Sequence, residues 1–170
     1  MPRSAAPNSH TFQVTTPSQR EIHMTRLFDA PRRLVFEVLT RPEHIRHWWG
    51  ILGEGYAVTS CEVDLRPGGR WRYVSRTPQG QVAFHGLYSE VAPPERLVYT
   101  EVFEGGAGAP AEGGESHVTC TLTEEGGKTR MTLEARYASR EIRDIVLGSG
   151  MERGAAISYD LVEEIARRLS

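Results

Sequence analysis

Apolar and polar residues alternate along much of the chain, which is the pattern of half-buried strands. The clearest case is residues 117–123, where Val118, Cys120 and Leu122 alternate with threonines before Gly126-Gly127 turns the chain back into residues 129–137. Five further segments bounded by proline and glycine have strand character: 21–28, 56–65, 70–76, 81–91 and 96–103. The pattern therefore predicts seven strands joined by hairpins, which makes the sheet antiparallel.

Helical patterns occupy the remaining segments. Proline suits the first position of a helix, so a short helix is predicted to begin at Pro31, and a second is predicted after Thr40, which we expect to cap it. Ser139 is the expected N-cap of a third short helix. Residues 151–169 contain no proline and carry a broad apolar stripe, which predicts a long C-terminal helix that is mostly covered.

This order predicts an α+β fold in which a curved antiparallel sheet of about six to seven strands wraps around the long C-terminal helix, with two short helices after the first strand. The length of 170 residues suits one domain. Residues 1–19, with three prolines and no acidic residue, are predicted to be a disordered N-terminal tail, and residues 20–170 the single domain. Residues 104–115 are rich in glycine and are predicted to form a mobile loop.

Composition excludes several classes of protein. The chain has 20 basic and 22 acidic residues, which argues against a strongly basic nucleic-acid binder and against a polybasic membrane-surface protein. No apolar run is long enough to insert into a membrane. Cys61 and Cys120 lie far apart without zinc-site spacing, as is usual in a reducing cytosol, so we expect a cytoplasmic protein. The sequence lacks nucleotide-binding and metalloprotease motifs, and we expect no catalytic residue, metal or cofactor.

Aromatic and ionisable residues are concentrated where a sheet would face a helix. Any one of them is explained equally well by core packing, but together they favour an amphipathic cavity between sheet and helix, where small ligands usually bind. His85 and Glu101 lie in the middle of predicted strands, and a one-residue change of strand phase would send either to the opposite face. His44 and His47 lack the third ligand that a metal site needs, so we expect a solvated helix surface there. The predicted ligand-binding residues are Phe36, Trp48, Trp49, Trp71, Tyr73, Tyr88, Tyr99, Glu101, Met131, Met151, Ala155 and Tyr159.

Several motifs together resemble a known family. They are Phe28-Asp29-Ala30-Pro31, Leu39-Thr40-Arg41-Pro42-Glu43, Trp48-Trp49-Gly50, Asp64-Leu65-Arg66-Pro67-Gly68-Gly69, Gly86-Leu87-Tyr88-Ser89-Glu90-Val91 and Pro93-Pro94-Glu95-Arg96-Leu97. Residues 20–169 resemble the SRPBCC superfamily, also called the START or birch-pollen-allergen-like helix-grip fold, and within it the AHSA-like family named after the activator of the 90-kDa heat-shock-protein ATPase. The chain departs from the family pattern at Ala155, where tryptophan is common, and at Tyr159, where an aliphatic residue is common; these changes would enlarge the cavity and add a hydroxyl to it.

The resemblance implies a protein that binds a small hydrophobic or amphipathic molecule between sheet and C-terminal helix, as a monomer or homodimer. Two alternatives stay open. One is an enzyme of the cyclase or aromatase type that uses His85 or Glu101. The other is a protein-interaction or co-chaperone-like module, which would need an exposed apolar patch.

Overall fold

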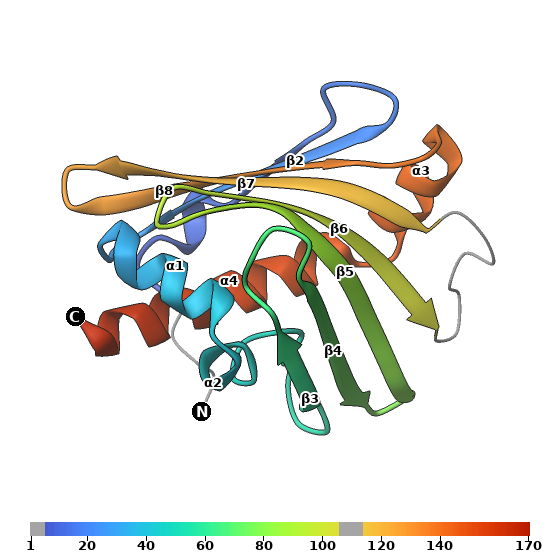
Figure 1. Cartoon of the computed structure of the whole chain (residues 1–170), viewed down its shortest axis with the longest axis horizontal. Coiled ribbons are helices and arrows are strands. Elements are labelled where there is room, and N and C mark those ends of the chain that lie inside the picture. The colour runs from blue at the N-terminus through green and yellow to red at the C-terminus, as the bar shows by residue number, and fades with distance from the viewer. Residues whose placement is uncertain (1–5, 106–113) are drawn as a thin grey trace.

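A computed structural model describes residues 6–105 and 114–170, and in it one large antiparallel sheet curves over a long helix (Figure 1). The eight strands lie in the order β1-β2-β8-β7-β6-β5-β4-β3. The strands are β1 (Gln13–Thr15), β2 (Glu21–Phe28), β3 (Ala57–Val63), β4 (Arg70–Thr77), β5 (Gly80–Ala92), β6 (Arg96–Gly105), β7 (Glu115–Glu125) and β8 (Lys128–Arg136). The expected helix-grip architecture is confirmed, with one strand more than the alternation predicts.

The helices lie along the concave face and at the ends of the sheet. The long helix α4 runs beneath the sheet, and α1 packs against it (Figure 1). The helices are a 3-10 turn η1 (Ser9–Thr11), α1 (Arg32–Thr40), α2 (Pro42–Ile45), α3 (Arg140–Gly148) and α4 (Met151–Leu169). No helix in residues 6–105 and 114–170 is long and apolar enough to cross a membrane.

Strand alternation sets the inner face of the sheet. In β2, the side chains of Ile22, Met24, Arg26 and Phe28 are buried, while the residues that alternate with them are half-buried. The β7–β8 hairpin pairs Cys120 with Leu133, two buried residues on one face. The core therefore lies between this face and the helices, as the period-two pattern predicts.

Of two expected helix N-caps, one is confirmed and the other is wrong. The Ser139 cap is confirmed, because its Oγ accepts a hydrogen bond from the Ile142 amide at 3.2 Å. The Thr40 cap is wrong: Thr40 is the last residue of α1, and its hydroxyl donates to the Phe36 carbonyl at 2.7 Å. The helix α2 instead begins at Pro42, where the missing amide proton costs nothing.

The N-terminal segment differs from the disordered tail that its composition predicts. From residue 6 onward it is ordered: η1 is followed by β1, whose Val14 pairs with Met24 of β2. The Thr11 hydroxyl also accepts a hydrogen bond from the Leu27 amide at 3.0 Å. A strand of three residues has too little alternation to be detected in a sequence. The remainder of the predicted tail, residues 1–5, and residues 106–113 of the predicted glycine-rich loop lie outside the described residues.

A buried ion pair joins β2 to α4. Arg26 faces inward, in phase with its apolar neighbours, and is fully buried, as is Glu163. The Arg26 guanidinium lies 3.4 Å from the Glu163 carboxylate and 2.8 Å from the half-exposed Asp160 carboxylate. Because an isolated buried charge is very costly, these charges are tolerated only as a group.

Candidate functional site

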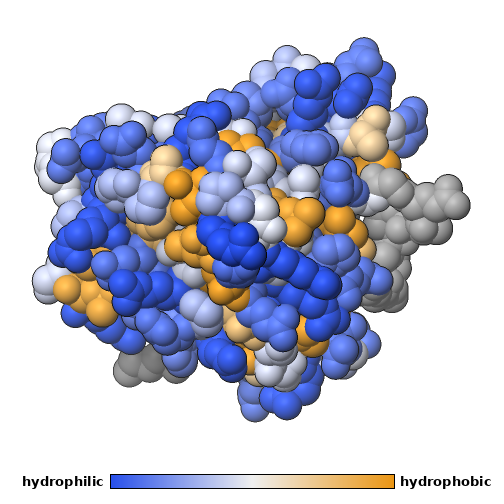
Figure 2. Space-filling view, in the orientation of Figure 1, coloured by the Kyte–Doolittle hydropathy of each residue, from blue (hydrophilic) through white to orange (hydrophobic). Residues whose placement is uncertain are grey.

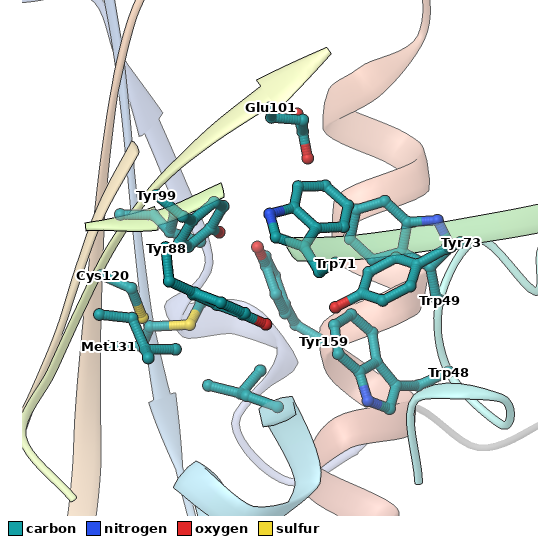
Figure 3. Close-up of a pocket in the computed structure, with 13 residues that line it drawn as sticks. Trp48, Trp49, Trp71, Tyr73, Tyr88, Tyr99, Glu101, Cys120, Met131 and Tyr159 are labelled. Carbon is teal, nitrogen blue, oxygen red and sulfur yellow. The ribbon is translucent and has the colours of Figure 1, made fainter. Parts of the chain in front are cut away.

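A small cavity lies between the inner face of the sheet and α4 (Figure 3). Its volume is about 60 Å³. Strands β4 to β8, helices α1 and α4 and the turn after α2 all contribute to its wall. The lining residues are Leu39, Trp48, Trp49, Trp71, Tyr73, Tyr88, Leu97, Tyr99, Glu101, Cys120, Met131, Leu133 and Tyr159.

Strand period and register bring these side chains together. Leu97, Tyr99 and Glu101 are alternate residues of β6 and therefore share one face. Tyr99 lies opposite Tyr88 of β5, and Leu97 lies opposite Cys120 of β7. Each strand thus places its inward residues beside those of the next strand, across the width of the sheet.

Trp49 is the centre of an aromatic cluster at one side of the cavity. Its ring makes edge-to-face contacts with Tyr73 at 4.9 Å and Phe84 at 5.5 Å between centroids. It makes similar contacts with Trp48 at 5.7 Å and Trp71 at 6.3 Å. Such pairs add specific geometry to simple burial, so this wall of the cavity is well defined.

The indole groups of Trp48 and Trp71 are held by hydrogen bonds to the backbone. Trp48 Nε1 donates to the Val38 carbonyl at 2.8 Å, and Trp71 Nε1 donates to the Thr100 carbonyl at 3.2 Å. The second bond needs the glycine at Gly86, because a Cβ there would lie 1.7 Å from the Thr100 oxygen and 2.6 Å from Trp71 Nε1. Gly86 therefore positions a cavity wall without lining it.

Four tyrosines bring polar groups to an otherwise apolar cavity. The hydroxyls of Tyr73 and Tyr88 point toward one another (Figure 3). Burial raises the pKa of Tyr88 to about 12 and the pKa values of Tyr73, Tyr99 and Tyr159 well above the ordinary 10. All four hydroxyls are therefore neutral at physiological pH and can both donate and accept hydrogen bonds.

Glu101 is the one acidic residue that the described part of the chain contributes to the lining. Its carboxyl points into the cavity toward Trp71 and Tyr159 (Figure 3). Burial raises the pKa of this carboxyl to about 7. Within the part of the chain that the structure describes, no side chain donates a hydrogen bond to this carboxyl. Its oxygen atoms are therefore available to a molecule in the cavity.

Nine of the twelve predicted site residues line this cavity, and three do not. Phe36 is buried inside the core, while Met151 and Ala155 are half-buried on the first turns of α4 and pack against the core. The helix presents Tyr159 to the cavity instead, and the Tyr159 ring contacts Phe12 and Phe28.

Sequence reasoning missed four lining residues: Leu39, Leu97, Cys120 and Leu133. None carries a chemical group that distinguishes it from core. Strand phase could have found two of them, because residues two apart in a strand lie on the same face. Leu97 lies two residues before Tyr99 in β6, and Leu133 lies two residues after Met131 in β8.

His85 lies outside the cavity, on the outer face of the sheet. Its Nδ1 is 2.9 Å from Glu104, which also accepts hydrogen bonds from Arg72 at 2.8 and 2.9 Å. The hydrogen bond from Arg72 is the main cause that lowers the pKa of Glu104 to about 2. The hypothesis of an enzyme that uses His85 in the pocket is therefore wrong. No group of three side chains in residues 6–105 and 114–170 could hold a metal ion.

The exposed apolar side chains come from several parts of the chain. On the face shown in Figure 2, hydrophobic areas are interrupted by hydrophilic side chains. In residues 6–105 and 114–170, the exposed large hydrophobic residues belong to five different segments of the chain: Leu52, Leu65, Leu87, Ile145 and Leu169. An interaction module would need such residues to form one patch.

An eight-stranded antiparallel sheet that grips a long C-terminal helix, with a cavity between them, defines a helix-grip protein. The chain belongs to the family described as Activator of Hsp90 ATPase homolog 1-like protein, whose profile matches residues 29–167. A comparison with curated proteins finds no match.

Solved structures with the same fold come from several bacteria. A protein from Rhodobacter sphaeroides is 25% identical, with a TM-score of 0.81 over 94% of this chain and 99% of that one. Protein Ms6760 from Mycobacterium smegmatis is 26% identical, with a TM-score of 0.75 over 93% of this chain and 98% of that one. Protein NE0264 from Nitrosomonas europaea is 24% identical, with a TM-score of 0.77 over 91% of this chain and 98% of that one, and shows likeness of fold alone.

Proposed function

We propose that this protein binds a small molecule in the cavity between the sheet and α4. The observation that carries the proposal is the set of hydroxyl and carboxyl groups from Tyr73, Tyr88, Tyr99, Tyr159 and Glu101 on an otherwise apolar wall. Buried polar groups are normally hydrogen-bonded, so groups that face a cavity favour water or a ligand as their partner.

The cavity volume limits the size of the ligand. A single water molecule needs roughly 10–15 Å³ of such space, so the cavity of about 60 Å³ has room for more than one water. This is well below the pockets that enclose drug-sized molecules. A ligand of a few non-hydrogen atoms fits without movement, and a larger one would have to displace aromatic side chains.

Intrinsic tryptophan fluorescence tests the proposal directly, because Trp48, Trp49 and Trp71 all border the cavity. The protein is titrated with small cationic, neutral and anionic organic molecules. Saturable quenching or a shift of the emission maximum is the expected result for at least one class. The absence of any response across the three classes would count against a ligand site.

A matched pair of variants separates binding in the cavity from binding elsewhere. Both cysteines are buried, but Cys120 lines the cavity and Cys61 does not. Cys120→Leu adds volume to the cavity wall and should abolish the fluorescence response, while Cys61→Leu should preserve it. Near-ultraviolet circular dichroism confirms that both variants are folded. Equal responses in the two variants would place the ligand outside the cavity.

The Glu101 carboxyl favours one second candidate, an enzyme of the cyclase or aromatase type. Burial raises the pKa of Glu101 to about 7, and a group with a pKa near the working pH can both give and accept a proton. In that case Glu101→Gln should abolish turnover even at ligand concentrations that saturate the variant. Unchanged turnover in Glu101→Gln would exclude the carboxyl as acid or base.

A further inference from the structure

The charge that the cavity lining can carry is negative. Among the described residues, Glu101 is the only carboxylic acid in the lining, and no arginine, lysine or histidine borders the space. The buried Arg26 is already paired with Glu163 and Asp160, so it does not offset the Glu101 charge. The cavity therefore has a negative carboxylate, when ionised, without a positive partner in its wall.

Aromatic rings supply most of the remaining surface. Seven of the thirteen lining residues are aromatic: Trp48, Trp49, Trp71, Tyr73, Tyr88, Tyr99 and Tyr159. The face of an aromatic ring is negative and attracts cations, and sites that bind quaternary ammonium groups combine several such rings. Both the aromatic rings and the Glu101 carboxylate therefore attract a positively charged ligand.

We propose that the cavity binds a small organic ammonium ion, held by the aromatic rings and by the carboxylate of Glu101. This inference rests on the proposed ligand-binding function and names the chemical class of the ligand. An organic anion such as a fatty-acid carboxylate would meet the Glu101 charge with no basic group to neutralise it, which disfavours that class. A bare metal ion would lack the three protein ligands that it needs.

The size of the cavity selects the probes. Because the cavity measures only about 60 Å³, the probes have to be small, and tetramethylammonium and tert-butanol are compact tetrahedral molecules of similar size. They differ chiefly in charge, and trimethylacetate serves as the anionic member of the set. Such small probes are expected to bind with dissociation constants in the millimolar range, so NMR chemical-shift titrations are suitable.

At pH 8.5, tetramethylammonium should bind about tenfold more tightly than tert-butanol, and trimethylacetate should bind more weakly than either. Glu101→Gln should bring the tetramethylammonium affinity close to that of tert-butanol, because the amide keeps the shape of the side chain and removes its charge. Glu104→Gln is the matched control. It removes a carboxylate from the same strand, but on the outer face, and should leave all three affinities unchanged.

A second readout uses the unmodified protein and does not depend on any variant folding. Lowering the pH from 8.5 to 5.5 protonates Glu101 and should weaken tetramethylammonium about tenfold, while tert-butanol is unaffected. The other ionisable groups that face Glu101 are Tyr73, Tyr99, Tyr137 and Tyr159, and all stay neutral because burial raises the pKa of each.

The outcomes distinguish this inference from the proposed function. If tert-butanol binds as tightly as tetramethylammonium, or if the Glu101→Gln and Glu104→Gln variants behave alike, the ammonium preference is wrong and the cavity remains a ligand site. If none of the three probes binds in the cavity, the ammonium inference fails. The fluorescence experiment with Cys120→Leu and Cys61→Leu then decides separately whether the ligand-binding function fails with it.

Discussion

Asn8 donates two hydrogen bonds to the buried carboxylate of Glu163, from its backbone amide to Oε1 at 3.1 Å and from Nδ2 to Oε2 at 2.8 Å. The Asp29 amide donates a third at 2.7 Å. The N-terminal segment therefore supplies part of the hydrogen bonding that allows the Arg26–Glu163 ion pair to be buried beneath the sheet.

Removing the Asn8 side chain should destabilise the whole domain. Asn8→Ala removes one hydrogen bond to a buried carboxylate, and we expect the free energy of unfolding to fall by about 2 kcal/mol. Chemical denaturation measures the change. His10→Ala is the control, because His10 lies in the same segment and is exposed. Equal stabilities of the two variants would mean that the contact of Asn8 with Glu163 contributes nothing in solution.

Glu163→Gln should be more damaging, because it removes the charge that lies beside the fully buried Arg26. Breaking a buried pair in this way typically costs about 3–5 kcal/mol, although Asp160 compensates in part here. The loss should depend on pH. Burial alone would raise the pKa of Glu163, but the hydrogen bonds from Asn8 and Asp29 and the charge of Arg26 outweigh burial and lower it.

A lowered pKa in the folded state means that the ionised carboxylate stabilises the protein above its ordinary pKa of 4.5, and that this contribution disappears as the pH falls through the folded value. The unmodified protein and Glu163→Gln should therefore differ most at neutral pH and converge in acid. Urea denaturation at several pH values measures the difference. If the difference in unfolding free energy between the two proteins were the same at every pH, Glu163 would act by shape and not by charge.

Gly86→Ala should disturb the cavity wall. The added Cβ would lie 1.7 Å from the Thr100 carbonyl, so β5 and β6 would have to separate and Trp71 would lose its hydrogen bond. We expect a loss of about 3 kcal/mol in stability and a shift in tryptophan emission. Gly148→Ala is the control, because nothing lies within 4 Å of its Cβ and alanine favours a helix. A Gly86→Ala protein with unchanged emission would contradict the role assigned to this glycine.

Glu101→Gln should stabilise the empty protein at alkaline pH. Burial raises the folded pKa of Glu101 from 4.5 to about 7, so the folded state retains a proton that the unfolded state releases. Between these values the stability of the unmodified protein falls as the pH rises, by at most about 3 kcal/mol. The variant should lack this decline, so its advantage should be small at pH 4 and full above pH 7. Thermal unfolding across this range provides the measurement.

If the stability of Glu101→Gln falls with rising pH in the same way as that of the unmodified protein, the fall is caused by a group other than Glu101. Glu104→Gln is again the control, since its exposed ion pairs with Arg72 and His85 contribute little to stability.

Much of the fold could be predicted because its signals are local. The alternation in residues 117–123 and the glycines that follow identify the β7–β8 hairpin, and the proline-free apolar stripe identifies α4. The sequence also predicts that Tyr73, Tyr88 and Tyr99 line the cavity, because each lies in a strand with clear alternation, and all three do. The short β1 gives no such signal, so the order of the N-terminal segment was missed.

The sequence by itself determined most of the strands and helices, and the apolar face of the strands that alternate clearly, because those properties depend on neighbours a few positions away. Only the tertiary structure decided which distant side chains meet. Arg26 has the phase of a core residue, yet its charge can be buried only where α4 brings Glu163 beside it. Glu101 likewise faces an aromatic cavity only because β4, β5 and α4 converge around β6. The burial of a charge depends on every element packed around it, and that arrangement has no local pattern in the chain.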